Sequence, residues 1–164
     1  MANIQACLSS KTDNWATPQD FFDNLNEEFH FTLDPCANEE NHKCDLFFTK
    51  EQDGLTKDWG KHVVFCNPPY GKEIADWVRY SYEQSQKPNT TVVMLIPART
   101  DTRYFHDYIY GKAEIRFIKG RLKFGDATTA APFPSMIVIY RKSSWRDDLE
   151  VVRVKSSRDK DVLQ

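Results

Sequence analysis

A short run of four residues, Asn67-Pro68-Pro69-Tyr70, has the chemical groups needed to hold a flat molecule that carries an amine. The Asn67 side-chain oxygen and the Pro68 carbonyl are hydrogen-bond acceptors, and Tyr70 offers a ring for stacking. The run follows 63–66, a continuous apolar stretch typical of a buried parallel strand, and two prolines end a strand because they lack an N–H donor. These four residues are therefore candidate catalytic residues at the carboxyl end of a strand. An ordinary surface turn is the alternative interpretation.

The elements that must position this run alternate along the chain. Apolar residues at helical spacing predict a helix that ends near Phe29, a second from Ile74 to before Pro88, and a third over 104–109. For the first helix, Thr17 is the expected N-cap and Pro18 the first helical residue. Short apolar runs predict strands at 31–37, 44–49, 63–66, 91–96, 114–118 and 135–140. This order predicts an α/β fold: a mostly parallel sheet with an antiparallel pair, the last two strands, at one edge.

Ligands of open parallel sheets bind outside the carboxyl ends of the strands. Three segments fall at such ends, namely 34–37, 67–70 and 97–101. We therefore expect the site to be assembled from these segments.

Length and charge add further limits. The 164 residues suit a single domain, and the net charge of −2 conceals an asymmetry. Residues 1–70 carry 5 Lys/Arg against 12 Asp/Glu, which gives −7, whereas residues 71–164 carry 17 against 12, which gives +5. The stretch 99–142 holds nine basic residues against four acidic ones, which predicts a surface for DNA phosphates, with a merely solvated face as the alternative. Its candidate DNA-binding residues are Arg99, Arg121, Lys123, Phe124 and Phe133.

The chain shows no export signal and no apolar run approaching the ~18 residues that span a bilayer. A cytoplasmic protein without a membrane partner is expected, its four cysteines (Cys7, Cys36, Cys44, Cys66) being reduced thiols. Cys36, His42 and Cys44 invite a zinc interpretation, but their spacing matches no common zinc motif, so no metal is predicted.

Six segments, taken together and in this order, resemble the small phage-type DNA N6-adenine methyltransferases of the Dam family: 15–18, 33–37, 53–55, 67–71, 95–102 and 120–124. The resemblance implies a Rossmann-like class I methyltransferase fold with an antiparallel C-terminal strand. It also implies S-adenosylmethionine as cofactor, double-stranded DNA as partner, and methyl transfer to the N6 amine of a flipped adenine. By analogy with the phage enzymes, the methylation would protect DNA from restriction.

The resemblance also implies roles for individual residues. Asn67 and Pro68 would accept both amino hydrogens of the adenine, and Tyr70 would stack on its ring. Either Phe124 or Phe133 would cover the second face of the base. The cofactor would contact Trp15, Thr17, Pro18, Asp34, Cys36, Asp53, Leu55 and Asn67. The segment 34–38 lacks the glycine-rich turn that many such enzymes carry after the first strand.

Two other functions stay open at this stage. One is a methyltransferase for another planar amine, an RNA adenine or a protein glutamine; the other is a non-catalytic nucleic-acid-binding module stabilised by zinc. We expect residues 1–142 to form a single catalytic domain and 143–164 a charged extension with a short strand at 151–154. In so short a chain, sequence recognition must come from loops such as 120–134 or from the second subunit of a homodimer.

Overall fold

The computed structural model describes residues 15–142. Its strands are β1 (Val63–Cys66), β2 (Thr91–Pro97), β3 (Glu114–Phe117) and β4 (Ser135–Arg141), and its helices are α2 (Gln19–Phe29) and α3 (Ile74–Ser85). Two short helical turns complete it, the 3-10 turn η1 (Gly54–Thr56) and the π turn η2 (Phe105–Ile109). Cys7, the extension 143–164 and its predicted strand lie outside the described residues. None of the described helices is long and apolar enough to cross a membrane.

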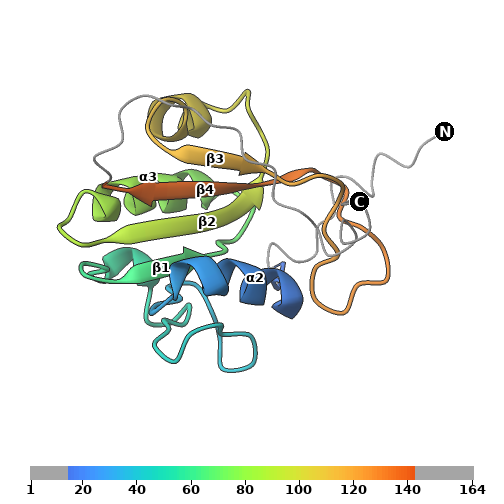
Figure 1. Ribbon diagram of the computed structural model, residues 1–164, viewed down its shortest axis with the longest axis horizontal. Helices are drawn as coiled ribbons and strands as arrows, with labels where there is room; N and C mark the ends of the chain where they lie inside the picture. Colours follow the sequence, from blue (N-terminus) through green and yellow to red (C-terminus); the bar gives the residue numbers. More distant parts are fainter. Residues whose placement is uncertain (1–14, 143–164) are drawn as a thin grey trace, which may run out of the picture.

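The four strands form one sheet in the order β1-β2-β4-β3. β1 and β2 pair in parallel, whereas β4 runs antiparallel to both of its neighbours. β1, β2 and β3 therefore point the same way, and their carboxyl ends meet at one end of the sheet (Figure 1). The predicted α/β class and the antiparallel pair at one edge are confirmed. Three of the four strands point the same way, as predicted for a mostly parallel sheet. However, β4 lies between β2 and β3, so two of the three strand pairings are antiparallel.

The two strands predicted before β1 are wrong as strands. Only isolated parallel bridges form there, Leu33 with Val64 and Asp34 with Phe47. Pro35 has no N–H to extend a ladder past Asp34. The Asp34 carboxylate also accepts from the main-chain N–H groups of Cys36 (3.4 Å) and Lys43 (3.0 Å), which bends the chain on both sides of the bridge.

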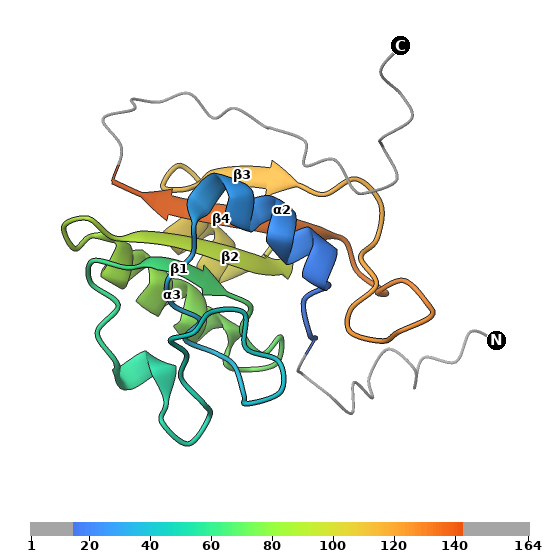
Figure 2. The ribbon, with the colours of Figure 1, turned by 60° about the horizontal axis from the view of Figure 1, so that its bottom comes forward.

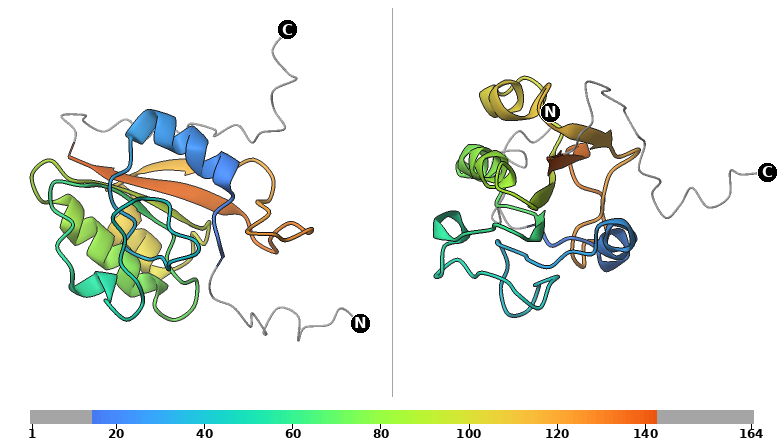
Figure 3. Two further views of the ribbon diagram at one scale, coloured as in Figure 1. Left: turned by 90° about the horizontal axis from the view of Figure 1, so that it is seen from below. Right: turned by 60° about the vertical axis from the view of Figure 1, so that its left-hand side comes forward.

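Helices cover both faces of the sheet. Figure 3 shows α2 on one face and α3 with η2 on the other. α2 buries Phe21, Phe22 and Leu25, as its spacing predicts, and the Phe22 ring packs edge-on against Phe65 of β1 at 5.1 Å between centroids. The core strands β2 and β4 are almost completely buried, so the sheet is a rigid support for the loops at its end.

The first helix starts one residue later than predicted. Pro18 occupies the cap position of α2, and Thr17 makes no cap hydrogen bond, so the expected N-cap is wrong. The buried Thr17 hydroxyl instead faces the turn after β1, where it accepts a hydrogen bond from Asn67. The helix ends at Phe29 as predicted, with His30 in a left-handed conformation (φ 56°).

The third predicted helix, 104–109, is helical as predicted, but most of it is of the π type. This part is a π turn, Phe105–Ile109, closed by a hydrogen bond of 2.8 Å from the Tyr110 N–H to the Phe105 carbonyl. Thr102 serves as its cap, since its hydroxyl lies 3.4 Å from the Phe105 N–H. The loop 120–134, between β3 and β4, projects beyond the end of the sheet near the start of α2 (Figure 2).

Candidate active site

The turn after β1 carries the predicted catalytic residues. β1 stops at Cys66, and the two prolines that follow Asn67 exclude further ladder pairing. The Asn67 side-chain NH2 donates to the Trp15 main-chain carbonyl and to the Thr17 hydroxyl, the latter at 2.9 Å. These bonds join residues about fifty positions apart in the chain, so the segment before α2 fixes the side chain of the β1 turn.

The other end of the same amide is unsatisfied. Asn67 Oδ1 has essentially no exposed surface and accepts no hydrogen bond from any residue in the described part of the chain. An unpartnered buried acceptor costs roughly 1–3 kcal/mol. Such an atom is expected where a ligand supplies the missing donor.

The Tyr70 ring is more buried than a ring that is free to stack on a base. It is only 6% exposed, and its hydroxyl donates to the Leu95 carbonyl at 3.0 Å. Burial raises the pKa of the phenol, so Tyr70 remains a neutral donor. Its ring is nearly perpendicular to those of Phe124 and Phe133, with centroids 6.1 Å and 5.6 Å away.

Trp15 joins the same group of rings. It packs edge-on against Phe124 at 5.5 Å and Phe133 at 5.2 Å. We call Trp15, Tyr70, Phe124 and Phe133 the aromatic cluster. The structure thus brings Trp15, predicted for the cofactor side, into contact with the two phenylalanines predicted for the target base.

The loop 120–134 reaches the site through this cluster. Its Gly125 N–H donates to the Ala16 carbonyl at 2.7 Å, and the left-handed φ of 55° at Gly125 suits glycine. A main-chain bond of 2.8 Å from Ala131 to Leu122 closes the loop on itself. The loop is therefore tied to the same segment, 15–17, that holds Asn67.

Asp34 lies at the end of the first bridge and is 4% exposed. Desolvation raises the pKa of its carboxyl to about 7, although the hydrogen bonds from Lys43 and Cys36 oppose that shift. It makes no ion pair among the described residues. The charges of His42 and Lys43 also favour the ionised carboxyl, but they offset less of the desolvation than a directly paired cation would, so a positively charged ligand would complete this site.

The second predicted cofactor segment packs directly on the first. A side chain at Gly54 would place its Cβ 2.1 Å from the Pro35 carbonyl oxygen, so only glycine permits this approach. The neighbouring Asp53 is exposed, and its carboxylate accepts from the Leu55 N–H at 3.1 Å. The segments 34–36 and 53–55 thus form one continuous surface.

A scan against protein families matches residues 5–163 to the DNA N-6-adenine-methyltransferase (Dam) family. The chain belongs to this family. It is an adenine-specific DNA methyltransferase, which modifies the N6 amine of adenine in DNA.

Curated relatives agree with this assignment. A DNA N-6-adenine-methyltransferase of Haemophilus phage HP1 is 33% identical over 94% of this chain and 95% of its own length. A DNA N-6-adenine-methyltransferase of Escherichia phage T1 is 34% identical over 67% of this chain, which spans 46% of that larger protein. A putative methyltransferase of Escherichia coli K12 is 37% identical over 38% of this chain.

The described part of the chain offers no site for the zinc alternative. Among residues 15–142, no three His, Cys, Asp or Glu side chains are arranged to hold a metal ion. His42 uses Nδ1 for the Cys44 carbonyl at 2.8 Å and stacks on Phe47. Burial raises the thiol pKa of both Cys36 and Cys44 to about 12, which opposes the thiolate form that zinc requires.

The predicted basic surface of this methyltransferase divides into two groups. Arg116 is 9% exposed and binds Glu28 of α2 through two hydrogen bonds of 2.6 and 2.7 Å, and Glu114 at 2.8 Å. Arg141 likewise pairs with Glu114 at 2.5 Å. Arg99, Arg121 and Lys123 are exposed. Arg116 fastens α2 to the sheet and Arg141 pairs within the sheet, whereas the exposed side chains of the second group are available for DNA.

Two of these contacts are not predicted by the sequence. The hydrogen bond between Thr17 and Asn67 is unexpected because Thr-Pro before an amphipathic helix typically indicates that the threonine caps the helix. The Arg116 bonds to Glu28 were hidden because they join residues 88 positions apart. Alternation along β3 was no help, since it places Arg116 on the same face as the polar Glu114 and opposite the apolar Ile115 and Phe117.

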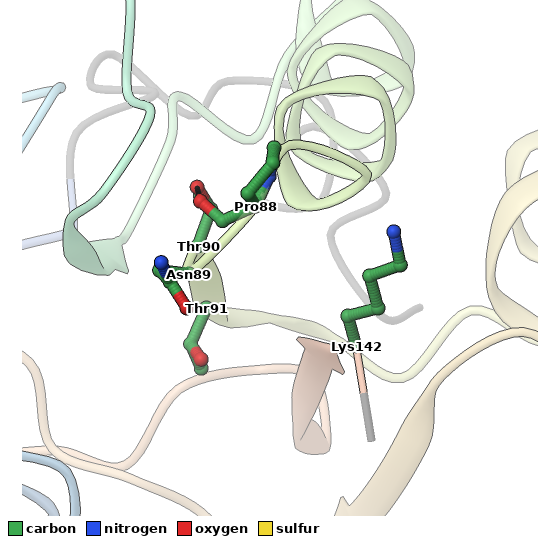
Figure 4. Close-up of a pocket in the computed structure, with 5 residues that line it drawn as sticks. All are labelled: Pro88, Asn89, Thr90, Thr91 and Lys142. Atoms are coloured by element: carbon green, nitrogen blue, oxygen red, sulfur yellow. Dashed lines mark hydrogen bonds between the residues drawn. The ribbon is translucent and has the colours of Figure 1, made fainter. Parts of the chain in front are cut away.

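A shallow hollow elsewhere on the surface is unrelated to this site. It is lined by Pro88, Asn89, Thr90, Thr91 and Lys142 (Figure 4). These residues lie where β2 begins and just after β4 ends, at the opposite end of the sheet from Asn67.

Proposed function

We propose that this methyltransferase takes its methyl group from S-adenosylmethionine and delivers it to a flipped adenine held by Asn67 and Pro68 at the carboxyl ends of the strands. The observation that carries the proposal is the buried, unpartnered Oδ1 of Asn67. Its NH2 group is already taken by Trp15 and Thr17, so the atom that remains is an acceptor, as an amine requires.

The chemistry needs little beyond positioning. The lone pair of the exocyclic amine is delocalised into the adenine ring, which makes the nitrogen a poor nucleophile. Hydrogen bonds from the amine to Asn67 Oδ1 and to the Pro68 carbonyl favour a pyramidal nitrogen with its lone pair directed away from the ring. The nitrogen–methyl bond then forms as the sulfur–methyl bond breaks, and the amine proton leaves afterwards to solvent. Catalysis is mainly orientation and electrostatics.

The residues on the cofactor side suit a cation. When bound, S-adenosylmethionine supplies an electrophilic methyl group on a positively charged sulfur. Asp34, buried and without an ion pair among residues 15–142, would hold the positive charge of the donor, which Cys36, Thr17 and Pro18 would also contact. Asp53 and Leu55 would contact the adenine of the donor. The parallel β1–β2 pair and the antiparallel β4 support a Rossmann-like class I methyltransferase fold.

The target base would enter against the aromatic cluster. Tyr70 is the ring on which adenine would stack, a contact typically worth about 1–3 kcal/mol per base. Because the Tyr70 ring is covered by its neighbours, stacking requires Phe124 or Phe133 to move aside. Phe133 is half-buried and Phe124 is 4% exposed, so Phe133 is the easier ring to displace.

Double-stranded DNA would lie across the exposed cations Arg99, Arg121 and Lys123. Recognition of the bases around the adenine would come from the loop 120–134 or from a second subunit. Residues 15–142 contain no separate domain for DNA recognition.

Incubation with S-adenosylmethionine and unmethylated duplex DNA, followed by nucleoside analysis, tests the proposal. The wild-type protein should form N6-methyladenine, and Asn67→Ala should reduce the rate by at least about a hundredfold. Calorimetry should show that Asn67→Ala still binds S-adenosylmethionine. Asn24→Ala is the matched control, because Asn24 is exposed on α2, and it should behave as wild type. Normal turnover by Asn67→Ala would remove the central role assigned to its amide.

A further inference from the structure

The Asn67 amide can present either its oxygen or its NH2 group to a bound base, because a half-turn of the side chain exchanges the two. Only the orientation with Oδ1 toward the amine helps the reaction, since an NH2 group there would meet the amine donor to donor. The orientation of this amide therefore decides whether the proposed reaction can proceed.

Two acceptors on the other side set that orientation. The Trp15 carbonyl can only accept hydrogen bonds, so the amide must turn its NH2 group toward it. The Thr17 hydroxyl accepts the second amide hydrogen at 2.9 Å. With both hydrogens engaged, Oδ1 is left facing away from the segment 15–17, buried and without a partner among residues 15–142.

Thr17 is well suited to hold such a bond. It is 6% exposed, so water competes little for its hydroxyl, and β-branching restricts its side chain to few rotamers. It has no role as a helix cap, because Pro18 occupies the cap position of α2. The hydrogen bond to Asn67 accordingly accounts for a hydroxyl at this buried position.

We infer that Thr17 is a positioning residue for methyl transfer: its hydroxyl, together with the Trp15 carbonyl, holds the Asn67 amide with Oδ1 directed at the target amine. This inference rests on the proposed function, in which Oδ1 accepts from the amine. It differs from the cofactor contact that the sequence resemblance implies for Thr17, because a positioning residue acts on the rate rather than on donor affinity.

Thr17→Val tests the inference, since valine keeps the shape of threonine and removes the acceptor. The single-turnover rate of methyl transfer at saturating donor should fall by about tenfold to a hundredfold, as small misplacements of reacting groups produce. The Kd for S-adenosylmethionine should stay within about twofold of wild type. Thr17→Ser, which restores the hydroxyl, should recover most of the rate. If Thr17→Val fails to fold, as judged by thermal unfolding, Thr17→Ala removes the same acceptor and carries the same measurement.

Three results would overturn the inference: an unchanged rate, a rate restored by raising the donor concentration, or a serine variant as slow as the valine variant. The second result would make Thr17 a cofactor contact. Asn67→Ala, measured alongside, separates this failure from failure of the proposed function. If Asn67→Ala is inactive while Thr17→Val is normal, only the positioning role fails; if Asn67→Ala is active, the acceptor role itself fails.

Discussion

The two sides of the active site are built differently. On the side of the β1 turn, the polar groups are fixed by main-chain partners: Asn67 by the Trp15 carbonyl, and Asp34 by two N–H groups. On the side of the loop 120–134, residues 125–130 are all exposed, and the loop meets the site mainly through the phenylalanine rings of the aromatic cluster. On the proposed function, the groups that accept the amine would thus be preorganised, whereas the rings that cover Tyr70 would rearrange when the base arrives.

The segment 15–17 connects the two sides. Trp15 and Thr17 hold Asn67, the Ala16 carbonyl accepts from Gly125 of the loop, and the Trp15 ring packs on Phe124 and Phe133. The loop 120–134 and the Asn67 amide therefore share contacts with the same three residues, 15–17. The variants below test whether one side is rigid and the other adaptable.

The largest effect is expected at Tyr70, where both sides meet. Tyr70→Ala should abolish measurable methyl transfer and lower the free energy of unfolding by about 3–5 kcal/mol, because it empties a buried aromatic position. Tyr70→Phe keeps the ring and loses only the hydrogen bond to the Leu95 carbonyl, a change of about 0.5–1.5 kcal/mol. Chemical denaturation and the methylation assay measure both quantities.

The comparison between the two Tyr70 variants is the informative part. If the ring is what the base needs, Tyr70→Phe retains most of the turnover. A phenylalanine variant as inactive as the alanine variant would show that the hydroxyl, and not stacking, is essential at this position.

The next effect concerns Asp34 on the preorganised side. Asp34→Asn should weaken S-adenosylmethionine binding by about tenfold to a hundredfold, the range expected when a bond to a charged group is lost. In the wild-type protein the carboxyl has a pKa of about 7, and a cation favours its ionised form. Donor affinity should therefore rise between about pH 5.5 and about pH 7.5. Calorimetry on both proteins checks this, and an equally steep rise in Asp34→Asn would assign the titration to another group.

The Asp34 carboxyl should make the stability of the fold fall as the pH rises, whereas donor affinity rises. Its pKa is higher in the folded than in the unfolded chain, so the folded protein binds the extra proton at low pH. The contribution of Asp34 to stability is present below its unfolded pKa of about 3.9 and is lost as the pH rises through about 7. Asp34→Asn should thus melt at a higher temperature than wild type above pH 7, and the two melting temperatures should converge as the pH falls.

What the sequence predicted well are features decided by local chemistry. Continuous apolar runs gave β1, β2 and β4 to within one residue, since such runs have no other stable placement than a sheet interior. The same logic placed Asn67 at a strand end, because Pro68 and Pro69 cannot pair. Phe21, Phe22 and Leu25 identified the buried face of α2.

What the sequence predicted poorly are features decided by distant partners. Thr17 is of a residue type that commonly caps helices, but its hydroxyl accepts a hydrogen bond from Asn67 instead. Arg116 was counted as basic surface because its partner Glu28 lies in another element, and Arg141 because its partner Glu114 lies 27 positions away. The strand predicted at 44–49 shrank to one bridge because the Asp34 side chain draws the Lys43 N–H toward it. The positions of the aromatic rings around Tyr70 also depend on such long-range contacts.

The smallest effect is expected for the exposed cations of the loop. Arg121→Ala combined with Lys123→Ala should change the melting temperature little, since both side chains are exposed and Arg121 loses one long hydrogen bond, 3.3 Å, to the Ala131 carbonyl. Each phosphate contact contributes about 0.9 to the slope of log binding constant against log salt. The double variant should therefore reduce that slope by up to about 2, which DNA-binding titrations at several salt concentrations measure.

Arg116→Ala is the control, because it removes a charge of the same sign from the same stretch of chain. Arg116 faces Glu28 and Glu114 rather than solvent, so its loss should lower stability by about 1.5–3 kcal/mol and leave the salt slope as in wild type. The loop variant should thus change DNA binding and leave stability nearly unchanged, whereas Arg116→Ala should lower stability and leave DNA binding unchanged. If Arg116→Ala flattened the salt slope and the loop variant did not, the DNA surface would lie along β3 instead of the loop, and the adaptable side of the site would have to be sought there.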